Sequence, residues 1–153
     1  MALLKTVGLC KYFGGLKAVN HVDMEVQQGQ VFGIIGPNGA GKTTFFNLCA
    51  GTIPATEGEI WFDGKNITGY RPHMAAKTGI ARTFQNIQLF QNTTVLENVA
   101  VGFHIHTNTN MLDAVLGNAR QKNTEKEIYE KGAALLERLE LGQYKDTLAK
   151  NLP

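Results

Sequence analysis

The chain has 153 residues, 43% of them hydrophobic, and a formal net charge of +2. This length is enough for one domain with a packed core, or for one domain and part of another, and no apolar run approaches the ~20 residues of a membrane-spanning helix. Basic residues are spread along the chain, so we expect no nucleic-acid partner. Serine is absent, which excludes a serine nucleophile.

The first third of the chain predicts β-strands followed by a short helix. Apolar residues alternate with polar ones around residues 7–9 and 22–26, as in half-buried strands. Residues 31–35 form a short apolar run of the kind that a buried parallel strand needs. Residues 43–50 are expected to form a helix that ends near Gly51, since glycine is the usual residue just past a helix end.

The expected strand and helix flank a glycine-rich segment that fits G-x-x-x-x-G-K-[ST], the phosphate-binding loop. Glycines allow backbone N–H groups to turn inward toward a polyphosphate at the helix N-terminus. Lys42 is expected to reach the β- and γ-phosphates, and the Thr43 hydroxyl is expected to ligate Mg²⁺. The alternative is a surface turn that happens to contain glycines and a lysine. The expected binding residues are Gly36, Pro37, Asn38, Gly39, Ala40, Gly41, Lys42, Thr43 and Thr44.

Two further segments suggest contacts with a nucleotide. Tyr12 and Phe13 precede two glycines, so one of these rings could stack on a base, although both could equally be core residues. Residues 80–84 predict a strand that runs into Gln85, at the end of a strand where α/β sheets place ligand-contacting groups. Gln85 could thus approach Mg²⁺ and an attacking water, and an ordinary polar loop residue is an equally good interpretation. Residues 57–62 predict another strand, closed by an Asp-Gly turn.

Beyond residue 92 the pattern becomes helical. Thr94 with Glu97, and Thr124 with Glu127, are T-x-x-E capping boxes that predict two helix starts. We expect the second helix to end at residues 141–142. Its expected features are a Glu127–Lys131 pair and an apolar face of Ile128, Leu135, Leu136 and Leu139. Residues 1–92 are therefore predicted to be an α/β nucleotide-binding core, and residues 93–153 the beginning of a helical part.

The cysteines and histidines give little indication of a metal site. Cys10 and Cys49 show no metal-binding or redox spacing and are expected to be buried thiols in a reducing cytosol. His104 and His106 could chelate a metal, but no further ligand is evident near them in the sequence.

Taken together, these motifs resemble the ATP-binding cassette of ABC transporters. The resemblance rests on residues 13–15, 36–44, 58–64 and 82–85, and it extends over the whole chain. Residues 43–47, 82–90 and 94–98 look like branched-chain amino acid importers, and residues 104–120 look like the larger of that system's two ATPase subunits. The implied fold is an α/β P-loop NTPase of the ABC type, with N-terminal antiparallel strands and a partial α-helical subdomain.

The resemblance also implies roles and partners. Phe13, rather than Tyr12, would stack on adenine, and Gln85 would be the Q-loop glutamine that works with Lys42 at the Mg²⁺–ATP site. The implied partners are integral-membrane permease subunits, a second ATP-binding cassette in a homo- or heterodimer and, indirectly, a substrate-binding protein. The implied location is peripheral, on the cytoplasmic face of the plasma membrane.

The chain departs from the family pattern in what it lacks. It contains no signature motif, no apolar strand ending in Asp-Glu and no later switch histidine, so we expect an N-terminal fragment of a longer subunit. The intact subunit would couple ATP binding and hydrolysis to amino acid import, while this chain alone is expected to bind ATP weakly without turnover. The alternatives are a regulatory nucleotide-binding module and a soluble non-transport ABC protein.

Overall fold

The computed structural model describes residues 2–83, 88–103 and 119–152, the side chains of 119–122 excepted. The chain divides into two compact units, Met1–Thr83 and Phe84–Pro153, and each is described by itself. Within the described residues, no helix has the length and apolar character needed to cross a membrane.

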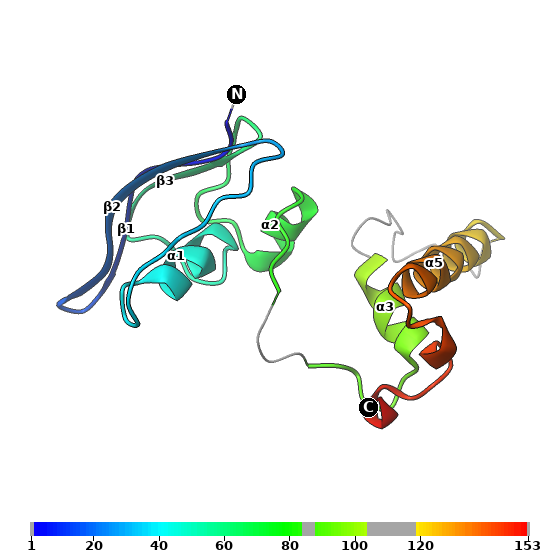
Figure 1. Cartoon of the computed structure of the whole chain (residues 1–153). Coiled ribbons are helices and arrows are strands. Elements are labelled where there is room, and N and C mark those ends of the chain that lie inside the picture. The colour runs from blue at the N-terminus through cyan, green and yellow to red at the C-terminus, as the bar shows by residue number, and fades with distance from the viewer. Residues whose placement is uncertain (1, 84–87, 104–118, 153) are drawn as a thin grey trace. The chain divides into compact units, whose positions relative to one another are not determined.

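The first unit contains an antiparallel sheet in the order β2-β1-β3-β4 (Figure 1). Its strands are β1 (Ala2–Phe13), β2 (Leu16–Gln27), β3 (Glu57–Phe62) and β4 (Lys65–Asn66). The predicted alternating strands are thus confirmed. Asp63 and Gly64 both have positive φ, 48° and 73°, as the two central residues of a type I′ hairpin turn require.

Helix α1 (Lys42–Cys49) lies against one face of this sheet (Figure 1). Leu9, Val19 and Ile60 of the sheet form a buried cluster with Phe45 and Leu48 of the helix. The predicted helix is confirmed, and its C-terminus is followed by Gly51 at φ 70°, whose N–H donates to the Leu48 carbonyl. A second short helix, α2 (Pro72–Lys77), begins with proline at its first position, where no amide hydrogen is needed.

Two predicted strands are absent from the described residues. Residues 31–35 have no regular structure, and Val31 and Ile35 are 99% and 95% exposed, so the prediction of a buried strand there was wrong. A parallel strand needs neighbours for its hydrogen bonds and cover for both faces, and no strand in the described part of the chain pairs with this segment. Residues 80–83 likewise form no strand. Backbone contacts instead join Ile80 to α2, where its N–H donates to the Ala75 carbonyl.

The second unit is helical, with α3 (Val95–Phe103), α5 (Ala119–Arg138) and the 3₁₀ turns η2 (Gly142–Tyr144) and η3 (Ala149–Asn151). Helices α3 and α5 pack closely where α5 carries Gly132, because a Cβ there would lie 3.1 Å from Leu96 Cδ1. The predicted capping box at the start of α3 is confirmed. The Thr94 N–H donates to Glu97 Oε2 at 2.7 Å, and the Glu97 N–H donates to Thr94 Oγ1 at 3.1 Å.

The boundaries of α5 differ from the prediction at both ends. Thr124 is not a helix start, because the helix already begins at Ala119. The helix ends at Arg138, before the expected closure at residues 141–142: Glu140 adopts φ 60° and the Leu141 N–H donates to the Leu136 carbonyl, as in a Schellman motif.

The expected side-chain pattern of α5 is confirmed in part. Lys131 Nζ pairs with Glu127 Oε1 at 2.7 Å. Ile128 and Leu136 are buried, whereas Leu135 and Leu139 are 38% and 57% exposed, so the predicted apolar face is narrower than expected.

Candidate phosphate-binding site

The glycine-rich loop is shaped by glycines in left-handed backbone conformations. Gly39 and Gly41 have φ of 84° and 83°, a region that side chains rarely adopt. Gly41 also lies against β2, since a Cβ at this position would fall well inside 3.0 Å of the Ala18 carbonyl oxygen. Conformation and close packing both require glycine here, and the loop backbone lies directly against β2 at this point.

Lys42, the first residue of α1, reaches back over the loop. Its Nζ donates to the Gly36 carbonyl at 2.6 Å and to the Pro37 carbonyl at 2.7 Å. The ammonium group therefore lies beside the first two residues of the loop. Gly41 at the N-cap makes no side-chain capping bond, and the first turn of α1 carries no acidic residue. The N-terminal end of this helix, with its partial positive charge, is thus not neutralised by its own side chains.

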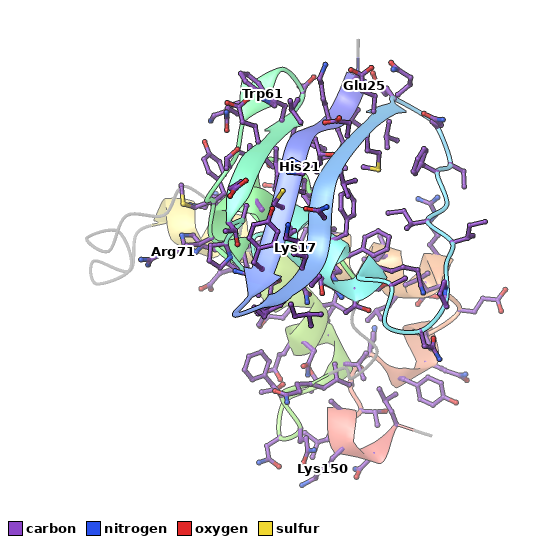
Figure 2. The ribbon with its side chains drawn as sticks, turned by 90° about the vertical axis from the view of Figure 1, so that its left-hand side faces the viewer. Lys17, His21, Glu25, Trp61, Arg71 and Lys150 are labelled. Carbon is purple, nitrogen blue, oxygen red and sulfur yellow. The ribbon has the colours of Figure 1, made fainter. Side chains whose placement is uncertain are left out.

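Phe13 and the loop line one hollow of about 350 Å³. Phe13 is half exposed at the end of β1 and lines this hollow. Lys17, near the start of β2 (Figure 2), lines the same hollow. Tyr12 is not among the lining residues; its hydroxyl donates to Asn20 Oδ1 at 3.4 Å, and Lys17 Nζ lies 5.6 Å from its ring centre. The site residues that the hollow brings together are Phe13, Asn38, Gly39, Ala40, Gly41, Lys42, Thr43 and Thr44.

A larger hollow, of about 510 Å³, lies between β2 and residues 32–35. It shares Lys17, Gly41 and Lys42 with the smaller one, but Phe13, Thr43 and Thr44 do not line it. Its lining includes the apolar residues Phe32, Ile34 and Ile35, from the segment that was expected to be a buried strand. The smaller hollow is therefore the candidate for phosphate binding, because it contains most of the residues expected from the sequence.

The segment that leads toward Gln85 is connected to α1. The Arg82 guanidinium donates to Asn47 Oδ1, and the Asn47 carbonyl accepts the Thr52 N–H at 2.9 Å. Gln85 itself lies outside the described residues, as do His104 and His106. The sequence did not predict the positions of Lys17 and Asn47. A lysine shortly after the aromatic-glycine segment was the available indication for Lys17, and nothing in the sequence indicated the Arg82–Asn47 contact.

Comparison with known proteins identifies the family. A family model described as ABC transporter matches residues 19–152. The chain belongs to this family. It is 42% identical over 150 residues to the high-affinity branched-chain amino acid transport ATP-binding protein BraF of Pseudomonas aeruginosa, and the match covers 98% of this chain and 59% of that protein. It is also 42% identical over 152 residues to a probable branched-chain amino acid transport ATP-binding protein, LivG, of Archaeoglobus fulgidus, and this match covers 99% of this chain and 58% of that protein.

Solved structures agree with this assignment. A nucleotide-free ATP-binding cassette from an ABC transporter matches with a TM-score of 0.78 and 38% identity, covering all of this chain and 60% of that one. The ADP conformation of MJ1267, another such cassette, matches with a TM-score of 0.79 and 37% identity. The predicted fold class, an α/β P-loop NTPase of the ABC type, is confirmed. The chain spans about 59% of the length of the curated relatives it matches.

Proposed function

We propose that this ABC family chain binds ATP with Mg²⁺ and forms the nucleotide-binding part of a subunit that drives amino acid import. The observation that carries the proposal is the hollow in which Phe13, Lys17 and the phosphate loop meet. This donor set fits a nucleoside polyphosphate: it offers an aromatic face, two ammonium groups, and a helix N-terminus without a capping side chain.

Each group has a distinct task in this proposal. Phe13 stacks on adenine, and the loop amides and Lys42 bind the phosphates. The loop residues Gly36, Pro37, Asn38, Gly39, Ala40 and Gly41 shape the backbone, and the Thr43 and Thr44 hydroxyls stand at the N-terminus of α1, with Thr43 as the Mg²⁺ ligand. Lys42 already contacts two carbonyls of the loop, so a modest swing of its ammonium group would exchange them for phosphate oxygens.

Hydrolysis needs groups beyond this hollow. Gln85 is the proposed contact to Mg²⁺ and the attacking water, and the Arg82–Asn47 bond positions the segment just before it. The sequence holds no apolar strand ending in Asp-Glu. We therefore propose that residues 1–92 form the ATP-binding core, that residues 93–153 begin the helical subdomain, and that these 153 residues bind ATP without sustained turnover.

Transport is the function that the relatives' names support. BraF and LivG are named as ATP-binding proteins of branched-chain amino acid transport. By that likeness, the intact subunit would act at the cytoplasmic face of the membrane with permease subunits, a second cassette and, indirectly, a substrate-binding protein. Co-purification with membranes, dependent on permease expression, distinguishes this role from that of a soluble ABC protein.

Nucleotide affinity tests the first step. A charge-assisted hydrogen bond contributes about 1.5–3 kcal/mol, so Lys42→Ala should weaken Mg²⁺–ATP binding at least about tenfold. Lys77→Ala removes the same charge from the last turn of α2 and should leave affinity unchanged. Phe13→Leu should also weaken binding, by about 1 kcal/mol or more, while Phe13→Trp should retain it. Equal affinities of the Lys42 and Lys77 variants would contradict the proposed site.

A further inference from the structure

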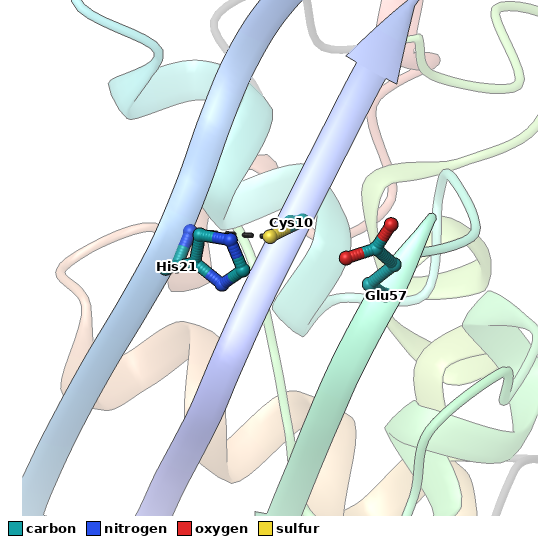
Figure 3. Close-up of side chains that lie close together, drawn as sticks. All are labelled: Cys10, His21 and Glu57. Atoms are coloured by element: carbon teal, nitrogen blue, oxygen red, sulfur yellow. Dashed lines mark hydrogen bonds between the residues drawn. The ribbon is translucent and has the colours of Figure 1, made fainter.

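Three side chains of metal-binding type meet on the antiparallel sheet, outside the lining of the nucleotide hollow. Cys10 comes from β1, His21 from β2 and Glu57 from the start of β3, and Figure 3 shows the cysteine between the other two. One ligand atom of each, the thiol sulfur, an imidazole nitrogen and a carboxylate oxygen, lies within 4.8 Å of the other two. The three residues are far apart in sequence, so only the fold brings them together.

Strand register explains the meeting. Cys10 is the direct partner of Glu57 across β1 and β3. Between β1 and β2 the register shifts, with Leu9 opposite Val22 but Lys11 opposite Val19, so β2 has an extra residue at this point. Such a bulge changes the direction of the side chains next to it. Here the His21 backbone lies beside Cys10 at the bulge.

The backbone of His21 is unusual in a way that fits this arrangement. Its φ is 46°, in the left-handed region that few non-glycine residues adopt, and its N–H donates to Cys10 Sγ at 3.1 Å. Strained positions of this kind concentrate at functional sites. If Cys10 bound a metal as a thiolate, the hydrogen bond from the His21 N–H to its sulfur would remain and become stronger, because the acceptor would then carry a negative charge. Hydrogen bonds of this kind to metal ligands help to orient them.

The burial of the three groups leaves a route for an ion. Cys10 is fully buried, whereas His21 and Glu57 are exposed, so the cluster has a protein side and a solvent side.

We propose that Cys10, His21 and Glu57 bind a zinc ion, with water as the fourth ligand. Thiolate, imidazole and carboxylate are all zinc ligands, and a thiolate–imidazole pair disfavours Mg²⁺ and Ca²⁺. Zinc bonds of about 2.0–2.3 Å at tetrahedral angles place ligand atoms roughly 3.3–3.7 Å apart, so side-chain adjustments of about 1 Å suffice. As the zinc–sulfur bond forms, the thiol proton passes to solvent; the imidazole binds neutral and the carboxylate as its anion.

This site would tie three strands of the sheet together. Cys10 is three residues before Phe13 on β1, and His21 is on the other arm of the same hairpin. A ligand that binds only the folded state raises the unfolding temperature in proportion to the logarithm of its concentration. Zinc should therefore stabilise the hairpin that carries Phe13, independently of whether nucleotide binds.

The test is a titration of the metal-free protein, without nucleotide, with Zn²⁺ and separately with Co²⁺. The expected result is one ion per chain, a thiolate-to-Co²⁺ absorption band in the near ultraviolet, and a Zn²⁺-dependent rise in Tm. Loss of a residue that only hydrogen-bonds to a metal ligand already lowers metal affinity 10–100-fold. Replacing a ligand itself, as in His21→Asn or Glu57→Gln, should therefore weaken zinc binding about 100-fold or more. Cys10→Ala should abolish the band. Cys49→Ala and Glu59→Gln are the matched controls and should bind as the unmodified chain does.

The variants also show whether the metal binds at Cys10, His21 and Glu57 or at other side chains. His21 and Glu57 are exposed, so their variants should fold even if the buried Cys10 variant does not, and far-ultraviolet circular dichroism verifies this. Unchanged affinity in both exposed variants would overturn the proposal. It would also fail if a variant lacking His104 and His106, with the three ligands intact, no longer bound the metal.

Discussion

Replacing Gly41 by alanine should destabilise the protein more than replacing Gly39, although the two glycines have nearly the same backbone conformation. Their φ angles are 83° and 84°. An added Cβ at Gly39 meets nothing within 4 Å, whereas at Gly41 it overlaps the Ala18 carbonyl oxygen and lies 3.2 Å from the carbonyl carbon. The pair therefore separates backbone strain from packing against β2.

The magnitudes follow from these two terms. Alanine in the left-handed region costs about 1–2 kcal/mol, and a less flexible unfolded chain offsets about 0.4–1 kcal/mol of this. Gly39→Ala should thus lower the free energy of unfolding by roughly 1 kcal/mol. Forcing an extra methyl group into a packed contact adds about 1–3 kcal/mol, so Gly41→Ala should lower it by roughly 2–4 kcal/mol.

Urea unfolding of both variants, followed by circular dichroism, measures the difference. An unchanged slope of free energy against urea would show that the variants differ in stability and not in the compactness of either state. Equal losses for the two variants would refute the claim that contact between Gly41 and Ala18 holds the phosphate loop against the sheet.

Three further predictions concern other parts of the chain. Thr94→Ala removes the hydroxyl that accepts the Glu97 N–H, one of the two reciprocal capping bonds of α3, and should cost about 1 kcal/mol of stability in urea unfolding, while Thr94→Ser should cost little. Burial raises the pKa of the Cys49 thiol to about 11, so its alkylation by iodoacetamide at pH 8 should be slow and should accelerate on unfolding; fast labelling of the folded protein would contradict this. The hydrogen bond from Lys131 lowers the pKa of Glu127 below its ordinary 4.5. The stability from this exposed pair is therefore present at neutral pH and lost as the pH falls through the lowered pKa, and Lys131→Met should return the carboxyl pKa, measured by NMR titration, toward 4.5.

The features that were predicted correctly are those that depend on residues close together in the sequence. The alternating residues of β1 and β2, the Asp63-Gly64 turn and the Thr94 capping box appeared in the structure because each is specified by a few neighbouring residues. The boundaries of α5 were missed for a related reason. The residues from Ala119 onward are mostly good helix formers, so the helix continues past the capping box at Thr124.

Features that depend on distant partners could not be obtained in the same way. Residues 31–35 have the composition of a buried strand, but a strand also needs paired neighbours, and its composition does not supply them. The same limit applies to the sites. The phosphate loop is contiguous and could be recognised, whereas the cluster of Cys10, His21 and Glu57 depends on strand register and a bulge.

NMR chemical shifts of the backbone amides and aromatic rings would map where Mg²⁺–ATP binds and so test the proposed phosphate-binding site directly. We expect the largest changes at the amides of Gly39, Gly41 and Thr43 and at the ring of Phe13, and Lys42→Ala should need at least about tenfold more nucleotide to produce them. Saturable changes confined to residues outside the loop, with Phe13 unaffected, would contradict it.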